Sequence, residues 1–349
     1  MCPVCSRLVT FESTECLHCG SELGYDPASR EMRVRGSEDS HSCANAQLVA
    51  CNWLVRSPDE LCASCVLTRT RPNDGDAAGI GGLAAAEAAK RRLLFELADI
   101  GLPIVGWKEA PDGLAFDLLS SEQTAVTTGH ADGVITLDLD ETDPAHRERM
   151  RVRLGEPYRT VLGHLRHEIG HYYQPILVAE GTPAESRCRE LFGDERESYQ
   201  EAMDRYYETG PSPGWEQLYV SAYATMHPWE DWAETFAHYL HVRDTLQTAA
   251  AYGVRIDGPA VHTEDSAPLH STPSDAGSNV REMLEAWIPL TYALNAISRS
   301  MGALDLYPFI LSPEIESKLE FIDGLVRSRA WQDAGVTHAA ASVRLTPTV

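Results

Sequence analysis

The sequence predicts an α+β protein in which small cysteine-rich modules precede a larger, mostly helical domain with a small β-sheet. Eight of the nine cysteines lie before residue 66, so the amino-terminal part differs sharply from the rest. Helix-like apolar spacing dominates after residue 83, and three short runs of β-type composition lie between residues 114 and 139. With 349 residues the chain exceeds the usual size of a single core, which favours one large domain plus a smaller part.

The charge balance and the absence of long apolar runs restrict the partners. Lys and Arg number 29 against 52 Asp and Glu, giving a formal charge of −23. Because no local concentration of basic residues offsets this charge, we expect neither nucleic acid nor a membrane as a partner. The start of the chain lacks the basic and apolar regions of a secretory signal, so a cytoplasmic location is expected. In a reducing compartment, the cysteines are better explained by metal binding than by disulfides.

The first cysteine set is Cys2-x-x-Cys5 and Cys16-x-x-Cys19, two tight pairs separated by ten residues. Two such pairs can place four thiolates tetrahedrally around one zinc ion, as in a zinc ribbon. His18 lies inside the second pair, but Cys19 already completes the spacing. We therefore expect the four cysteines, and not His18, to bind zinc.

The second set is Cys43, Cys51, Cys62 and Cys65, of which only the last two have the tight spacing. A module of this size can hardly bury enough apolar surface without a metal, which favours a second zinc over four buried thiols. The expectation is two structural zinc ions, with a single one as the alternative. Four-cysteine sites have no open coordination position, so residues 1–71 are interpreted as tandem zinc ribbons that are structural or bind a protein partner.

The glycine-rich segment 72–82 is predicted to be a flexible linker to a second domain, residues 83–349. In that domain we expect helices over residues 83–100, 157–174, 229–252, 280–301 and 312–329, strands over 114–119, 124–128 and 134–139, and a long mobile loop over 257–278. The lone Cys188 is interpreted as a buried packing residue.

The segment His167-Glu168-Ile169-Gly170-His171 carries the clearest chemistry. Residues four apart share one face of a helix, so the two imidazoles can bind a single zinc ion. Glu168 is rotated by about 100° from His167, so its carboxylate can act as a general base on a metal-bound water. A chance match on a surface helix is the alternative, but apolar residues beside the histidines indicate a packed helix. His164 is not expected to be a ligand.

A third ligand is expected from the segment that begins at Pro228, because a catalytic zinc needs three protein ligands and an open position. Glu230 and Glu234 lie one helical turn apart there. Glu230 can bind zinc while Glu234 accepts a hydrogen bond from a ligand histidine, and the reverse assignment stays open. A solvated acidic helix start is the simpler explanation, but the surrounding large apolar residues argue against it. His238 and His241 are interpreted as packing or surface groups.

The HExxH motif followed by Glu-x-x-Ala-Glu resembles the gluzincins, metallopeptidases whose third ligand is a glutamate. The segment from Tyr223 to Phe236 is similar to that of lethal-factor-type metalloproteases, in which a tyrosine seven residues before the ligand glutamate assists catalysis. This resemblance implies that Glu230 is the ligand, that Glu234 supports a ligand histidine and that Tyr223 donates to the transition state. From the residues alone, Tyr223 is better explained as a core tyrosine.

Nearly the full chain resembles a bacterial family of zinc-binding metallopeptidases with amino-terminal zinc ribbons. The shared segments are Cys51–Val55, Leu61–Cys65, His164–Glu168 and Trp287–Thr291. The resemblance implies a zincin-like domain that hydrolyses peptide or amide bonds with one catalytic zinc ion, acting on a peptide or protein substrate. The segment 134–139 is expected to be an edge strand that pairs with an extended substrate. The alternative function is a zinc-ribbon adaptor or regulatory binding protein with an inactive peptidase scaffold.

Overall fold

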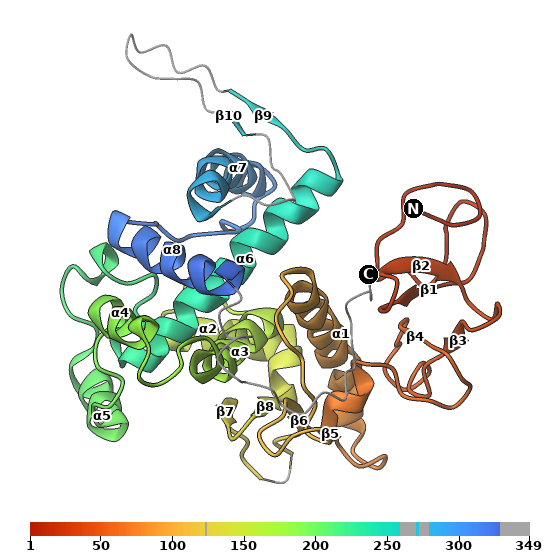
Figure 1. The fold of residues 1–349 in the computed structure, drawn as a ribbon, viewed down its shortest axis with the longest axis horizontal. Helices are drawn as coiled ribbons and strands as arrows, with labels where there is room; N and C mark the ends of the chain where they lie inside the picture. Colours follow the sequence, from red (N-terminus) through yellow and green to blue (C-terminus); the bar gives the residue numbers. More distant parts are fainter. Residues whose placement is uncertain (123, 259–269, 272–278, 329–349) are drawn as a thin grey trace. The chain divides into compact units, whose positions relative to one another are not determined.

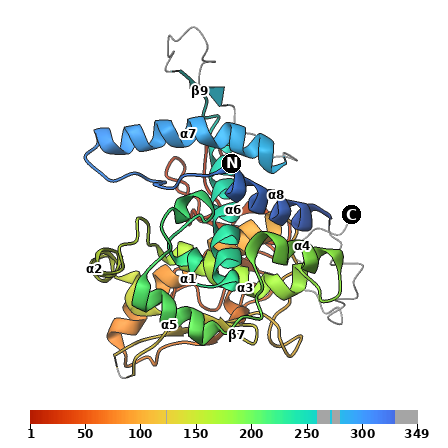
Figure 2. The same cartoon turned by 90° about the vertical axis from the view of Figure 1, so that its left-hand side faces the viewer.

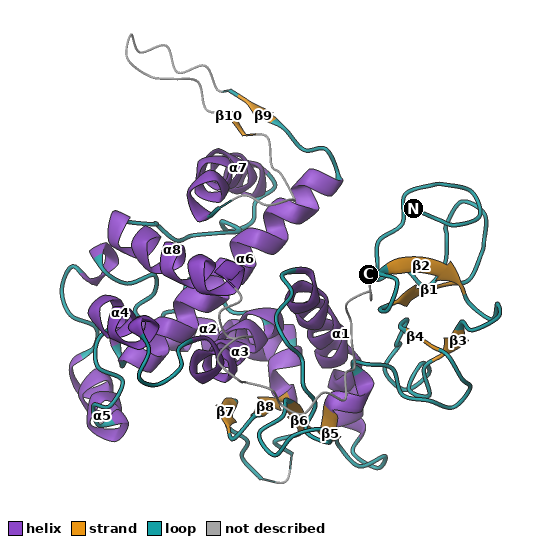
Figure 3. Ribbon diagram, in the orientation of Figure 1, coloured by secondary structure: helices purple, strands orange, loops and turns teal. Residues whose placement is uncertain are grey.

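A computed structural model describes residues 1–122, 124–258, 270–271 and 279–328. The chain divides into two compact units at Glu168–Ile169, a point that lies inside the single helix α3 (Val161–Leu177). The first unit holds the short strands of the cysteine-rich part and a four-stranded sheet, and the second is mainly helical (Figure 3). The predicted α+β class is confirmed.

Two small hairpins form the cysteine-rich part (Figure 1). They pair β1 (Leu23–Asp26) with β2 (Glu31–Val34), and β3 (His41–Ser42) with β4 (Leu54–Val55). The hairpins are joined because the backbone N–H of Tyr25 donates to the carbonyl of Asn52 at 2.8 Å. The rings of Tyr25 and Trp53 lie 5.5 Å apart and supply a shared apolar centre.

The larger sheet has the strand order β5-β6-β8-β7. Its strands are β5 (Thr68–Thr70), β6 (Ala115–Leu119), β7 (Gly129–Ala131) and β8 (Val134–Asp138). Strand β6 runs parallel to β5 and β8, whereas β7 is antiparallel to β8. The prediction that residues 134–139 form an edge strand is therefore wrong, because β8 has a neighbour on both sides.

The strand predicted over residues 124–128 is also wrong, since the strand β7 begins only at Gly129. The reason is the turn that follows it. Asp132 and Gly133 have φ of 49° and 79°, and a two-residue turn with two positive φ angles joins antiparallel strands directly. The residues next to the turn therefore pair, as Ala131 does with Val134.

Helix α1 (Ala77–Asp99) begins inside the predicted linker 72–82, which is therefore not a flexible connection along that part. The side chain of Asp76 accepts a hydrogen bond from the N–H of Gly79 and so starts the helix. A Cβ on Gly82 would lie 2.4 Å from Thr142 Oγ1, in the short 3₁₀ segment η2 (Leu139–Thr142). Glycine thus allows close packing here, where the composition suggested flexibility.

The other helices are α2 (Pro144–Leu154), α4 (Pro183–Phe192), α5 (Tyr199–Thr209), α6 (Pro228–Ala251), α7 (Val280–Ser300) and α8 (Pro313–Ser328). In the second unit α6, α7 and α8 pack against one another (Figure 2), around the fully buried side chains of Trp232, Phe236 and Trp287. Each of these three helices lies within two residues of its predicted bounds.

Helix α3 differs from its prediction at both ends. It begins at Val161, four residues later than predicted, and continues through Pro175 to Leu177. Most of the predicted loop 257–278 lies outside the described residues, apart from the short strands β9 (Ile256–Asp257) and β10 (His270–Ser271). Within the described part of the chain, every helix is too short or too polar to cross a lipid bilayer.

Candidate metal centres

The first cysteine set is brought together as predicted. The Sγ atoms of Cys2, Cys5, Cys16 and Cys19 all lie within 4.8 Å of one another. The Sγ atoms are 3.8 Å apart for Cys2 and Cys19 and 3.6 Å apart for Cys5 and Cys16. A disulfide would require about 2.05 Å. Thiolates at about 2.3 Å from one tetrahedral zinc ion lie about 3.8 Å apart, so the arrangement fits zinc.

The second set, Cys43, Cys51, Cys62 and Cys65, forms a similar group in which all four residues are buried. The sulfurs of Cys51 and Cys62 lie 3.6 Å apart. The backbone N–H groups of Asn45 and Cys62 approach Cys43 Sγ at 3.4 and 3.3 Å, as expected for donors that support a thiolate ligand. Both sets can hold zinc, and four thiolate ligands leave no coordination position open for a reacting water.

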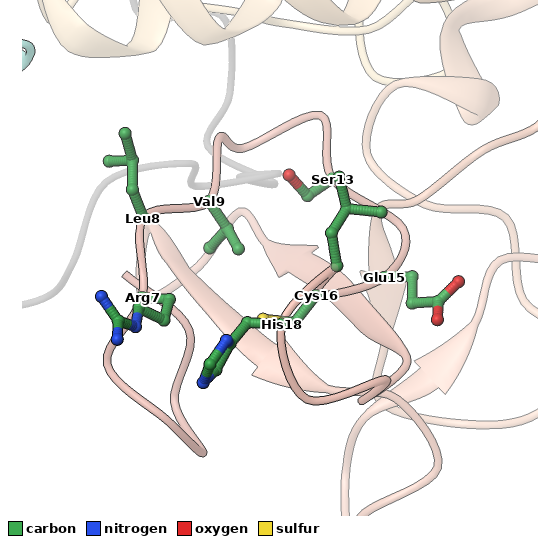
Figure 4. A pocket seen from close by; sticks show the side chains of 8 residues that line it. Arg7, Leu8, Val9, Ser13, Glu15, Cys16 and His18 are labelled. Atoms are coloured by element: carbon green, nitrogen blue, oxygen red, sulfur yellow. The ribbon is translucent and has the colours of Figure 1, made fainter.

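His18 does not belong to the first ligand group. It lines a hollow of about 380 Å³ on the first cysteine module (Figure 4). The other labelled lining residues are Arg7, Leu8, Val9, Ser13, Glu15 and Cys16. The hollow contains none of the predicted catalytic residues, so it is a feature of the zinc ribbon.

Helix α3 is fixed at its start and along its first turns by ion pairs in the first unit. The Thr160 hydroxyl accepts a hydrogen bond from the N–H of Gly163, which caps the helix. Glu141 pairs with Arg159, and its carboxylate lies 3.2 Å from His164 Nε2. Burial raises the pKa of Glu141, but hydrogen bonds from His164 and Arg159 lower it to about 2. His164 therefore supports the helix through Glu141.

A buried ion pair lies directly before the metal-binding motif. Arg166 donates two hydrogen bonds to the Glu96 carboxylate of α1, at 3.0 and 2.5 Å, and both side chains are about 4% exposed. Such a two-pronged pair fixes orientation as well as distance. It sets the rotation of α3 one residue before His167.

Helices α3 and α6 cross closely at Gly170. A Cβ on Gly170 would lie 3.0 Å from Ala233 Cα and 3.2 Å from Phe236 Cβ, which is tighter than ordinary van der Waals contact. The indole N–H of Trp232 donates to the Gly170 carbonyl at 2.9 Å, inside the same crossing. The glycine of the motif thus allows α6 to lie against the turn that carries His171.

The start of α6 is set by His227. Its Nδ1 accepts a hydrogen bond from the N–H of Trp229 at 3.1 Å, so Nε2 carries the proton and donates to the Glu197 carbonyl at 3.2 Å. One turn of helix then places Glu230, which is 2% exposed. Its Oε2 lies 3.4 Å from His171 Nε2.

Helices α3 and α6 together supply the group His167, His171 and Glu230, whose ligand atoms lie within 4.8 Å of one another. Ligand atoms at about 2.0–2.1 Å from a tetrahedral zinc ion lie about 3.3–3.4 Å apart, which matches the spacing of His171 and Glu230. Two imidazoles and one carboxylate are a donor set typical of catalytic zinc. The residues present therefore fit the metal.

The three acidic residues at the start of α6 have separate surroundings. Glu230 belongs to the candidate metal-binding group. Asp231 is fully buried and pairs with Lys318 of α8 at 2.6 Å, and burial raises the pKa of Asp231 to about 7 against the opposing effect of Lys318. Glu234 is partly buried and, among the described residues, is not in a metal-binding group.

Tyr223 opens the short segment η4 (Tyr223–Thr225), seven residues before Glu230. Burial, followed by the charge of Glu230, raises the pKa of Tyr223 well above its usual value, so its hydroxyl keeps its proton. Glu168 is 7% exposed on α3. The rings of His238 and His241 pack against Tyr307, and neither histidine belongs to a candidate metal-binding group among the described residues.

Sequence reasoning missed several residues that support this group. The Tyr199 hydroxyl donates to Glu230 Oε1 at 2.9 Å, yet no motif marks that tyrosine. The Glu96–Arg166 pair joins residues 70 apart and has no local pattern either. Gly170 could have been noticed, because a glycine inside a helical pattern often has a packing role.

Residues 81–325 match the family described as "Putative zinc-binding metallo-peptidase". The chain belongs to this family. Residues 1–76 match a zinc-ribbon domain, which agrees with the two cysteine groups.

Uncharacterized proteins of Mycobacterium tuberculosis (strain H37Rv) and Mycobacterium bovis are similar to the chain. Each is 50% identical over 329 residues, covering 93% of this chain and 94% of the relative. No solved structure matches the chain. The family description gives zinc binding and peptidase character and names no residue that performs the reaction.

Proposed function

We propose that this protein is a zinc-dependent metallopeptidase of the gluzincin type that hydrolyses peptide or amide bonds. The observation that carries the proposal is the convergence of His167, His171 and Glu230, whose ligand atoms lie within 4.8 Å of one another. In this proposal these three residues hold the catalytic zinc ion. A zinc ion bound there supplies Lewis acidity and lowers the pKa of its water to about 7.

The remaining steps belong to side chains of the chain itself. Glu168 follows His167 on α3 and takes the proton from the attacking water, then passes it to the leaving amine. The protonated hydroxyl of Tyr223 donates a hydrogen bond to the oxyanion that develops on the substrate carbonyl. Glu234 accepts a hydrogen bond from a ligand histidine and so fixes the orientation of that ring.

The substrate in this proposal is a peptide or protein segment in extended conformation. Strand β7 forms one edge of the sheet β5-β6-β8-β7, and an edge strand can pair with an added strand through main-chain hydrogen bonds. This replaces the expectation for residues 134–139, which form the internal strand β8. Proline at His130, the centre of β7, would remove a backbone N–H and test whether the edge is used.

The proposal is tested with Glu168→Gln. Parent and variant are incubated with a complex peptide mixture, and new peptide termini are identified by mass spectrometry. The parent should cleave, whereas the variant should keep its zinc and lose cleavage by at least 100-fold, because an amide cannot take the proton. Glu285→Gln, an exposed change of the same type on α7, is the matched control and should leave cleavage unchanged. Equal cleavage by Glu168→Gln and the parent would reject the mechanism.

An adaptor role for the zinc ribbons is the second candidate. It is favoured by exposed apolar side chains on the first module, where Leu17 is 98% and Leu8 59% exposed. A protein partner there would be retained by Glu168→Gln and lost on Leu17→Ser, which separates the adaptor role from catalysis. The cytoplasmic location also remains a proposal, to be tested by fractionating cells.

A further inference from the structure

Helix α5 lies in the long stretch between His171 and Glu230, and the reaction as proposed does not use it. Of its eleven residues, only Ala202 is buried. Apolar packing therefore contributes little to holding this helix in place. Two of its tyrosines, Tyr199 and Tyr206, instead reach residues of the proposed site.

The two oxygens of the Glu230 carboxylate have different neighbours, and one of these neighbours is Tyr199. Its hydroxyl donates to Oε1 at 2.9 Å, and Oε2 lies 3.4 Å from His171 Nε2. A hydrogen bond to a charged carboxylate is stronger than one between neutral groups. With Oε1 engaged in this way, Oε2 is the oxygen directed toward the histidine ligand.

The position of Tyr199 is itself fixed from both sides. Ser198 caps α5 by accepting a hydrogen bond from the N–H of Glu201. The ring of Tyr199 lies 5.3 Å from the ring of His227, the residue that caps α6. His227 in turn donates to the Glu197 carbonyl at 3.2 Å, two residues before Tyr199. The starts of α5 and α6 are therefore joined by a side-chain-to-backbone hydrogen bond and by a contact between two rings.

Tyr206 lies seven residues after Tyr199, on the same face of α5. Its ring meets the ring of Tyr223 edge-to-face, with centroids 6.0 Å apart and an interplanar angle of 88°. One helix face thus contacts both the proposed third ligand and the proposed oxyanion donor.

We propose that α5 is the positioning element of the metal centre, and that Tyr199 restricts Glu230 to binding the metal through a single oxygen. This inference rests on the proposed function. Tyr199 is a positioning residue because it acts through Glu230. Tyr206 orients Tyr223 in the same way.

The test is the zinc affinity of Tyr199→Phe in the full-length protein, which keeps the ring contact with His227 and removes the hydroxyl. Proteins are equilibrated with graded dipicolinate and the retained zinc is counted, with His171→Ala giving the baseline held by the cysteines. The chelator concentration that removes half of the site's zinc should fall by at least tenfold, because partners of metal ligands typically contribute 10–100-fold in affinity. Tyr207→Phe, on the same helix and 68% exposed, is the matched control and should behave as the parent.

A double variant shows whether Tyr199 acts through Glu230. In a Glu230→Gln background, Tyr199→Phe should change zinc retention by less than threefold, since the interaction is already lost. Tyr223→Phe should retain zinc as the parent does, while lowering kcat. Any of three results would overturn the inference. Zinc affinity falls by less than tenfold in Tyr199→Phe, it falls equally in Tyr207→Phe, or Tyr199→Phe still lowers it by the full amount in the Glu230→Gln background. If the parent itself retains no more zinc than His171→Ala, the proposed function fails instead.

Discussion

Replacing Gly170 with alanine should weaken the proposed catalytic zinc site while changing the free energy of unfolding little. An alanine Cβ would lie 3.0 Å from Ala233 Cα and 3.1 Å from the Ala233 carbonyl oxygen. Ordinary carbon contacts are about 3.5–4.0 Å, so the helices α3 and α6 must separate by about 0.5 Å. Metal ligands tolerate about 0.2 Å. The shift therefore exceeds what the site can absorb.

The effect on stability follows from two opposing contributions. Alanine in place of a helical glycine stabilises by about 1 kcal/mol, whereas overpacking a close contact costs about 1–3 kcal/mol. We expect a net loss of about 0–2 kcal/mol in the free energy of unfolding, measured with urea. The affinity of the site for zinc, measured by chelator competition, should fall by roughly tenfold or more.

Gly324→Ala on α8 is the matched control, because nothing lies within 4 Å of the added Cβ. It should raise the free energy of unfolding by up to about 1 kcal/mol and leave zinc affinity unchanged. If Gly170→Ala keeps the parent's zinc affinity, the close crossing of α3 and α6 does not set the ligand spacing.

Three further predictions concern the supporting structure. Lys318→Met should cost about 1–3 kcal/mol, measured by urea unfolding at pH 7, because Asp231 loses its counter-charge and stays buried as a neutral acid without this hydrogen-bond partner; an unchanged free energy of unfolding would argue against the pair. The pKa of Glu141 is lowered from 4.5 to about 2, so its contribution of about 3 kcal/mol is complete above pH ~4.5 and is lost as the pH falls toward 2. Glu141→Gln should therefore flatten stability over that range, and an unchanged pH profile would contradict the assignment. Chelators should remove zinc from the cysteine group that contains the exposed Cys19 before they remove it from the fully buried group that contains Cys43. Each of the variants Cys2→Ser and Cys43→Ser leaves only the other cysteine group intact, so the two release rates can be measured separately; equal rates would refute this.

Local patterns predicted which candidate ligands come together. The spacing of His167 and His171 requires only a helix, and the two cysteine groups follow from pairs that are close in sequence. The structure places both features as their spacing implies. The choice between Glu230 and Glu234 could not be made from spacing, since both lie on α6 one turn apart. It depends on the rotation of α6 about its axis, which is set by distant contacts such as Trp232 with the Gly170 carbonyl.

Errors in the predicted fold arose where contacts with distant residues decide the structure and the local composition suggests a different one. Glycines before residue 83 suggested flexibility, but Gly82 is in a helix and closely packed on Thr142. The edge strand was misplaced because strand order is not encoded locally: β8 pairs with β6, from residues nearly twenty positions earlier in the chain, as well as with β7. Tyr199 was missed for the same reason, since its partner Glu230 is 31 residues away.

The central claim is that His167, His171 and Glu230 hold a zinc ion with an open position for a reacting water. Anomalous X-ray diffraction recorded at the zinc absorption edge, on crystals of the full-length protein, tests this directly. A peak is expected about 2.0–2.1 Å from the ligand atoms of these residues, in addition to the peaks at the cysteine groups. Peaks at the cysteine groups alone, in crystals grown with zinc present, would contradict it.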